Sequence, residues 1–299
     1  MDRLIGFMRL LRLANIVTTV SDILAGVAIA CFAIGIKWTD VSFPLVLLLI
    51  VSTVGLYGGG VVFNDVFDAE LDKVERPERP IPSGLISKPS AALFASFLLM
   101  VAIIAAGFVH EHFFSSSFFI ALAIAVAAVV YDKWGKHHSF LGPLNMGLCR
   151  GLNLLLGISI FPEVLSQYWF IAAVPIIYIA AITMISRGEV HGGKKTTVVA
   201  AVIFYIIVII CILAAAIANE SLSAFLFLAI FAALIFPPLL RAIREPNGTR
   251  IAKAVKAGVI ALIAMNAAWA AAFDAFYFAL LILLLLPLSI WLAKLFAVT

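Results

Sequence analysis

Long apolar stretches separated by short polar segments follow one another along nearly the whole chain. Ten of them are roughly 18 to 23 residues long, enough for a helix to cross about 30 Å of hydrocarbon. They cover residues 14–36, 43–64, 90–109, 114–131, 142–162, 168–186, 197–218, 221–240, 254–273 and 276–296. The pattern predicts an all-α fold, a polytopic transmembrane helical bundle of nine to ten spans. The pattern also predicts that residues 1–299 form a single integral membrane domain.

Composition agrees with this prediction. The mean hydropathy is +1.18, and only 12% of residues are charged, which excludes an ordinary water-soluble domain. When the ten spans are followed in order, all but two of the 20 lysines and arginines fall on one side; the exceptions are Lys37 and Arg150. The positive-inside rule then predicts a multi-pass protein of the cell membrane, with both termini and the charged loops in the cytoplasm. The net charge of +4 follows from this topology and does not indicate nucleic-acid binding.

An acidic segment follows the second span. Asp65, Asp68 and Asp72 are spaced i, i+3 and i+7, so a helix places them on one face. Charged groups beside apolar spans persist where they pair, meet water or bind a ligand. Carboxylate oxygens suit Mg²⁺, which completes its coordination with water and substrate phosphate. The spacing therefore predicts a Mg²⁺ site at the cytoplasmic edge, before a loop broken by Pro77, Pro80, Pro82 and Gly84.

Two more polar clusters fall on the same side, at residues 131–138 and 186–195. The cluster at residues 186–195 follows the sixth span in the same way that the acidic segment follows the second span. This four-helix period suggests two four-helix units around a cytoplasm-facing cavity. Basic side chains here would bind an anion with several oxygens, and a diphosphate bound through Mg²⁺ needs both signs of charge. The candidates are Lys133, Lys136, Arg187, Lys194 and Lys195 of these clusters, together with Arg79 of the loop after the acidic segment.

A few polar side chains lie inside the apolar spans. Asn15 and Asp22 are in the first span at i and i+7, where both would border the cavity, and Asn145 and Arg150 are in the fifth. Such residues either face a cavity and bind substrate or form hydrogen bonds with a neighbouring helix. Both interpretations fit the sequence.

The string Asn64-Asp65-x-x-Asp68-x-x-x-Asp72, followed by Arg79-Pro80-Ile81-Pro82-Ser83-Gly84, resembles the first signature of the UbiA superfamily of intramembrane prenyltransferases. The stretch from Tyr131 to Lys133, with Asn145 beyond it, is similar to the family's region between helices four and five. The resemblance implies Mg²⁺-assisted ionisation of a prenyl diphosphate and transfer of the prenyl group to a small aromatic or other electron-rich acceptor. The substrate's lipid tail would lie among membrane lipid and apolar helices. In this reaction Asp65, Asp68 and Asp72 would be catalytic metal ligands, Asn64 would bind substrate and Asp132 would act as a base.

The family's second signature is altered in this chain. Glu189 stands at its first acidic position and Gly193 at the second, in a form that resembles the EboC branch of the superfamily. Glu189 with His191 would hold a metal or a water, or the site would depend on the first cluster alone. The altered motif leaves open a weakened relative that binds or transports an isoprenoid or aromatic metabolite. An ion-coupled transporter would place its charges near the bilayer midplane instead.

Overall fold

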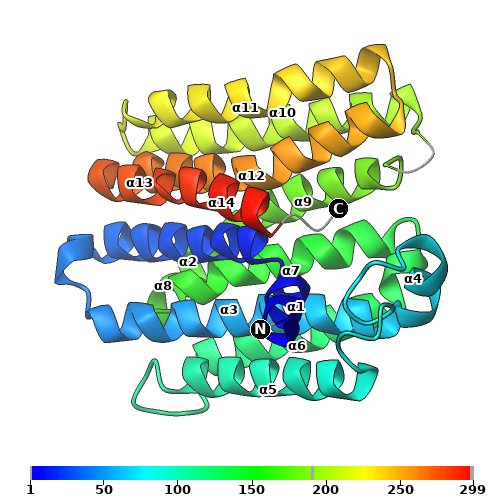
Figure 1. Ribbon diagram of the computed structural model, residues 1–299. Helices are drawn as coiled ribbons and strands as arrows, with labels where there is room; N and C mark the ends of the chain where they lie inside the picture. Colours follow the sequence, from blue (N-terminus) through cyan, green and yellow to red (C-terminus); the bar gives the residue numbers. More distant parts are fainter. Residues whose placement is uncertain (1, 190–191, 297–299) are drawn as a thin grey trace.

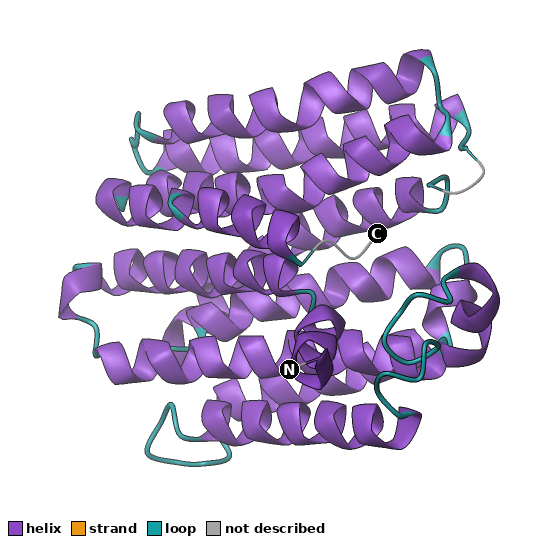
Figure 2. Ribbon diagram, in the orientation of Figure 1, coloured by secondary structure: helices purple, strands orange, loops and turns teal. Residues whose placement is uncertain are grey.

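The apolar segments of the chain form helices that run side by side along one common axis (Figure 1). The computed structural model describes residues 2–189 and 192–296, and the regular elements in this part of the chain are all helical (Figure 2). The long helices are α2 (Leu13–Ile34), α3 (Phe43–Phe67), α5 (Lys88–Gly107), α6 (Ser116–Lys133), α7 (Leu141–Ile158), α9 (Ala173–Ser186), α10 (Lys195–Ala218), α11 (Ala224–Arg244) and α12 (Gly248–Ala272). Shorter helices are α1 (Asp2–Leu11), α4 (Ala69–Glu75), α8 (Pro162–Tyr168), α13 (Phe276–Leu283) and α14 (Leu285–Leu295).

Within the described residues, nine helical segments are long and apolar enough to cross a membrane. The prediction of an all-α multi-pass membrane protein is confirmed. The expected fifth span, α7, is not among the nine, although it has 18 residues. Its hydropathy is lowered by three polar residues, Asn145, Arg150 and Asn153. Two of them, Arg150 and Asn153, contact polar side chains of α2 inside the bundle.

Two spans differ from the predicted boundaries. The sixth begins earlier, at α8, because Pro162 occupies a first-turn position that needs no hydrogen-bond donor. The tenth is divided into α13 and α14 at Leu284. Pro287, in the first turn of α14, has no backbone N–H to donate to the preceding turn, and its ring crowds that turn, so regular helical bonding is interrupted between α13 and α14.

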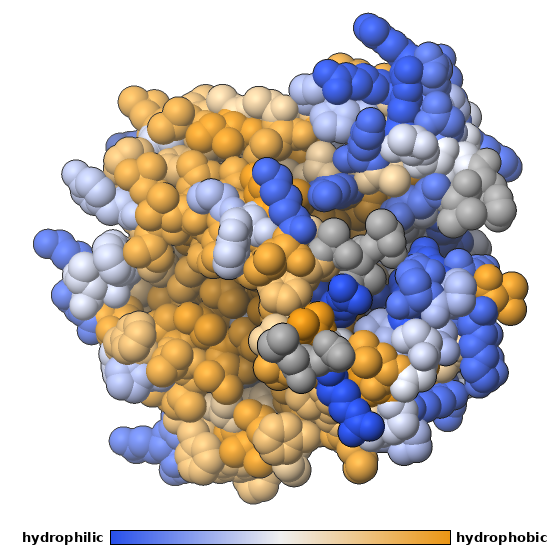
Figure 3. Space-filling view, in the orientation of Figure 1, coloured by the Kyte–Doolittle hydropathy of each residue, from blue (hydrophilic) through white to orange (hydrophobic). Residues whose placement is uncertain are grey.

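Most hydrophilic residues of the visible face gather at one end of the bundle and fewer stand at the opposite end, with a broad apolar surface between them (Figure 3). The connections at the charged end include residues 68–87, 134–140 and 245–247. This distribution matches a helical bundle whose apolar sides face lipid and whose polar end faces water.

Helix α1 was not predicted, because it is too short and too polar to resemble a span. Arg12 separates it from α2 with a backbone φ of 48°, in the left-handed region that non-glycine residues seldom adopt. Leu10 of α1 is buried in a small apolar cluster with Val62 of α3 and with Ile81 and Ile86 of the 76–87 loop. These contacts fix the loop against the end of the bundle.

Helices α2 and α7 approach each other closely at glycines. A Cβ on Gly26 would lie 2.5 Å from the Leu154 carbonyl oxygen, and one on Gly157 would lie 2.5 Å from the Ile23 carbonyl oxygen. Small residues permit such backbone contact between membrane helices. The contact brings the polar side chains of α2 and α7 into one layer in the middle of the bundle.

Candidate functional site

A cavity of about 380 Å³ lies inside the bundle between α2, α3, α6, α7, α9 and α12. Four of the predicted site residues line it, Asn15, Asn64, Asp132 and Arg150. Its wall also contains the tyrosines Tyr57 and Tyr131 and many aliphatic side chains. The predicted arrangement of two four-helix units accounts for only part of this wall, because α12, which belongs to the ninth apolar segment, also lines the cavity.

The predicted acidic cluster lies where α3 ends and α4 begins. Asp68 occupies the junction, and hydrogen bonds of 2.9 Å from its N–H to Asn64 O and 2.8 Å from Asp72 N–H to Asp68 O continue the helical pattern across it. Asp65 and Asp72 are buried, with 5% and 3% exposure, and Asp68 is half-buried. The local backbone therefore keeps the three aspartates close to one helical face.

Basic side chains pair with all three carboxylates. The Arg79 guanidinium joins two of them, 3.3 Å from Asp65 Oδ1 and 2.7 Å from Asp72 Oδ2. Arg12 also donates to Asp65 Oδ1, at 2.8 Å, and Lys136 pairs with Asp68 Oδ1. Because Arg12 also lines the cavity, it connects the acidic cluster with the interior of the bundle.

These carboxylates have the right chemistry for Mg²⁺ but do not form a complete cage. Each ion pair uses one oxygen of its aspartate, Oδ1 of Asp65 and Asp68 and Oδ2 of Asp72. In the part of the chain that the structure describes, no three His, Cys, Asp or Glu side chains are arranged to hold a metal. Mg²⁺ commonly keeps waters and binds through one or two carboxylates plus phosphate oxygens. The residues fit a metal that arrives with a phosphate-bearing ligand.

Asp132 and Asn64 form a second polar contact at the cavity wall. Asn64 Nδ2 donates to Asp132 Oδ1 at 2.9 Å, while Asp132 Oδ2 is buried without a hydrogen-bond partner among the described residues. Asn145 Oδ1 is also buried and unpartnered in that part of the chain, although Asn145 does not line the cavity. A buried carboxylate oxygen without a partner is a ready acceptor for a proton or a hydrogen bond.

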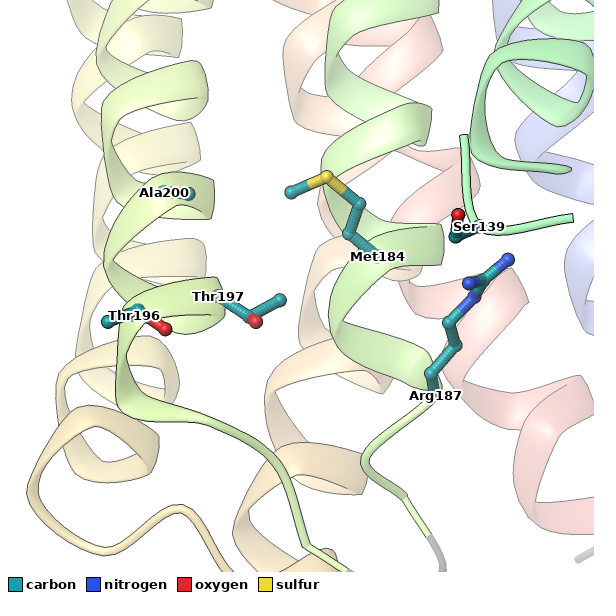
Figure 4. A pocket seen from close by; sticks show the side chains of 6 residues that line it. All are labelled: Ser139, Met184, Arg187, Thr196, Thr197 and Ala200. Atoms are coloured by element: carbon teal, nitrogen blue, oxygen red, sulfur yellow. The ribbon is translucent and has the colours of Figure 1, made fainter. Parts of the chain in front are cut away.

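Several predicted anion-binding residues lie away from the cavity. Lys133 is exposed, with its ammonium 4.4 Å from the centre of the Trp134 ring, and Lys194 is exposed before α10. Arg187 is exposed and donates to the His138 carbonyl at 2.8 Å. It lines a separate hollow between α9 and α10, where its guanidinium points toward Ser139 (Figure 4).

The altered second motif lies in the turn after α9. Glu189 is half-buried there, and burial raises the pKa of its carboxyl group, an effect that Arg76 partly opposes. A Cβ on Gly193 would lie 2.8 Å from Ile251 Cδ1, so a side chain at that position would require Ile251 to move. His191 lies outside the described residues. Among the described residues that line the cavity, the last one on α9 is Ser186.

Sequence reasoning missed one residue of this region and one contact. The sequence explains Arg12 by membrane topology alone, yet Arg12 contacts Asp65 across 53 positions. Asp22 is expected to border the cavity with Asn15, but it does not line the cavity and forms an ion pair of 3.2 Å with Arg150. The only available signal was that α2 and α7 each carry a costly charge, which suggests pairing between them.

Replacing Arg79 with methionine is expected to destabilise the protein by about 3 to 5 kcal/mol, because it leaves buried Asp65 and Asp72 without the cation that joins them. Unfolding in detergent by heat or denaturant would measure the change. The control is Arg250→Met, whose pair with Glu245 is exposed to solvent and should change stability by at most about 1 kcal/mol. Equal effects of the two changes would contradict this account of Arg79.

Comparison with known proteins gives concordant results. The model of the UbiA prenyltransferase family matches residues 23–263. Among curated relatives, the digeranylgeranylglyceryl phosphate synthase of Sulfurisphaera tokodaii is 30% identical over 180 residues, which are 60% of each chain. That of Methanococcoides burtonii is 38% identical over 104 residues, 35% of this chain and 36% of the relative. The chain thus spans at most about 60% of the length of these curated relatives.

Solved structures share the fold at low sequence identity. A UbiA homolog from Aeropyrum pernix K1 has a TM-score of 0.70 at 15% identity, covering 85% of this chain and 96% of that one. A UbiA homolog from Archaeoglobus fulgidus bound to GPP and Mg²⁺ has a TM-score of 0.61 at 14% identity, covering 91% and 99%. At these identities the likeness shows the arrangement of helices alone.

Proposed function

Because the chain belongs to the UbiA prenyltransferase family, we propose that it transfers a prenyl group from a prenyl diphosphate to an aromatic or other electron-rich acceptor. The observation that carries this proposal is the meeting of three aspartates, three basic side chains and an internal cavity at one end of the bundle. A prenyl diphosphate has a polyanionic head and an apolar tail, and this site offers a partner for each. The diphosphate would bind at the cytoplasmic face of the cell membrane.

The aspartates of the cluster, Asp65, Asp68 and Asp72, would hold the metal through their second oxygens. When bound, Mg²⁺ supplies positive charge that makes the diphosphate a better leaving group. Arg12, Arg79 and Lys136 would exchange part of their contact with the carboxylates for phosphate oxygens, where charge-assisted hydrogen bonds are strong. Glu189 would support the head group from the turn after α9.

The cavity would bind the reacting end of the prenyl chain and the acceptor. As the bond between carbon and oxygen breaks, positive charge develops on the allylic carbon, and the faces of Tyr57 and Tyr131 in the cavity wall can stabilise it. Asp132 would accept the proton that the acceptor loses, because its Oδ2 has no other partner among the described residues. Asn64, which donates to Oδ1, would hold the carboxylate in place.

One observation favours a second function. Gly193 stands where the resemblance to the family implies an acidic residue, and this favours a protein that binds or carries an isoprenoid or aromatic metabolite without turnover. The two functions differ in whether the bond to diphosphate is broken.

The deciding experiment incubates purified protein with labelled geranyl, farnesyl or geranylgeranyl diphosphate and a panel of acceptors. The panel includes phenols and glycerol ether lipids, because the relatives' names refer to a glyceryl phosphate product. Release of diphosphate together with a prenylated acceptor supports the transferase. Saturable binding of a prenyl diphosphate with no bond cleavage supports the carrier and overturns the transferase.

The change Glu189→Gln tests the altered motif. We expect about a tenfold or larger fall in turnover, because the substitution removes a charge near the head group while it keeps the side chain's size. The rate of diphosphate release measures the effect. Turnover at the wild-type rate would mean that the turn after α9 has a structural role only.

A further inference from the structure

A polar layer crosses the inner end of the cavity, far from the acidic cluster. Thr53 donates to Asn153 Oδ1 at 2.7 Å, and both residues line the cavity. Thr53 precedes Asn64 by eleven residues of α3, which is about 16 Å along a helix. The cavity therefore has polar residues at two levels, Asn64 with Asp132 near the charged end and Thr53 with Asn153 at its floor.

Asp22 anchors this floor but offers nothing to a ligand. It is 1% exposed, and its two oxygens accept hydrogen bonds from Asn266 at 2.7 Å and from Asn153 at 2.9 Å. The hydroxyls of the floor are also used, since Thr18 donates to the Asn15 carbonyl and Thr19 donates to the Ile16 carbonyl. The acceptors and hydroxyl protons around Asp22 are thus engaged within the protein.

Arg150 differs from Asp22 and the threonines, because some of its N–H donors have no hydrogen-bond partner among the described residues. It lines the cavity and is 8% exposed, and its Nη2 donates to the Thr18 hydroxyl. Nε and Nη1 are buried without a hydrogen-bond partner in the part of the chain that the structure describes. Nη1 lies 3.2 Å from Asp22 Oδ2, close enough for ionic attraction but not aligned for a hydrogen bond. Buried donors of this kind normally find an acceptor.

The charge of Asp22 decides which acceptor fits. The carboxylate already balances the guanidinium, so an anion at the floor would add an uncompensated charge within the membrane. An uncharged oxygen of a hydroxyl, ether or carbonyl group would satisfy the free donors without that penalty.

We propose that Arg150 binds an uncharged oxygen of the acceptor substrate at the floor of the cavity. The acceptor would then extend from Arg150 toward Asn64 and Asp132, and its nucleophilic end would meet the allylic carbon there. The inference rests on the proposed function, because it names a subsite for the second substrate of the same reaction.

Three probes of matched shape test the subsite by direct binding to the full chain in detergent. They are 4-hexylphenol, with a neutral oxygen, hexylbenzene, with none, and 4-hexylbenzoate, with an anionic group. The wild-type protein should bind the phenol about ten- to 100-fold more tightly than the hydrocarbon, as expected for a hydrogen bond from a charged donor. Equal affinity for the phenol and the hydrocarbon, or tighter binding of the benzoate, would overturn the proposal.

The double variant Asp22→Asn/Arg150→Gln removes the guanidinium without leaving a lone buried charge. It should lose the preference for the phenol, and a preference of unchanged size would overturn the proposal. Binding of geranyl diphosphate with Mg²⁺ by the same variant checks that the fold is intact. If that variant fails to fold, Asp132→Asn decides: it removes the carboxylate acceptor of the cavity wall, so it should keep the preference for the phenol, and loss of the preference there would overturn the proposal. Failure of the proposed function would be seen separately, as absence of prenyl-diphosphate cleavage by the wild type.

Discussion

Replacing Asp68 with asparagine is expected to reduce turnover of a prenyl diphosphate by at least about 100-fold, the usual effect of removing one electrostatic contact from a reacting group. Asp68 is the most accessible of the three aspartates and, among the residues that the structure describes, pairs with Lys136 alone, whereas Asp65 is held by two arginines. It is therefore the carboxylate most available to a metal. Asparagine keeps the shape of the side chain and removes its charge. Diphosphate release by the purified protein measures the loss.

The matched control for this change is Glu70→Gln. Glu70 lies on α4 within the same acidic segment, but it is exposed and pairs with Lys73 at 2.8 Å in solvent. We expect its turnover to stay within about twofold of the wild type, because surface ion pairs contribute little. An equal fall in both variants would show a general effect of charge. Full activity after loss of both Asp65 and Asp68 would remove the basis for a metal at this cluster.

Removal of divalent cations is expected to abolish turnover, and added Mg²⁺ is expected to restore it. In the structure three carboxylates are paired with three basic side chains, so the cluster is close to electrically neutral. A diphosphate would bring a large negative charge to a partly buried site with no net positive charge to receive it. Extra cations must therefore enter with the substrate.

The measurement is diphosphate release after treatment with a chelator, followed by a titration with Mg²⁺. A sodium salt at matched ionic strength serves as the control, since general screening should not restore activity. Turnover that continues in the chelated protein would mean that Arg12, Arg79 and Lys136 neutralise the diphosphate unaided.

The fold could be predicted largely from hydropathy, because a bilayer requires long apolar helices and permits few alternatives. The spans were located within a few residues, except where Pro162 extended the sixth and Pro287 divided the tenth. Helix α1 could not be predicted, because it is stabilised by the packing of Leu10 against a loop that is distant in the sequence. Such packing leaves no periodic pattern long enough to identify.

The site could be predicted in part. The spacing of Asp65, Asp68 and Asp72 is local, so sequence alone located their shared face. Contacts between helices are not local, and no sequence pattern predicts the ion pair between Arg12 and Asp65 or the one between Arg150 and Asp22. For Lys133, Arg187 and Lys194, the general enrichment of basic residues in the loops on one side of a membrane is enough to explain their positions. The roles assigned to these residues stay predictions.

The ion pair between Asp22 and Arg150 also has a consequence for biogenesis. Each charge at the centre of a lone helix opposes partitioning into lipid by about 2.5 to 3.5 kcal/mol, and α7 is the expected span that is not apolar enough to count among the nine. Helix α2 is apolar enough to span the membrane despite Asp22, and pairing of Asp22 with Arg150 lowers the cost of both charges once α7 packs against α2. Insertion of α7 is therefore expected to depend on its contact with α2, and Asp22→Ala should lower the fraction of α7 that is integrated into the membrane.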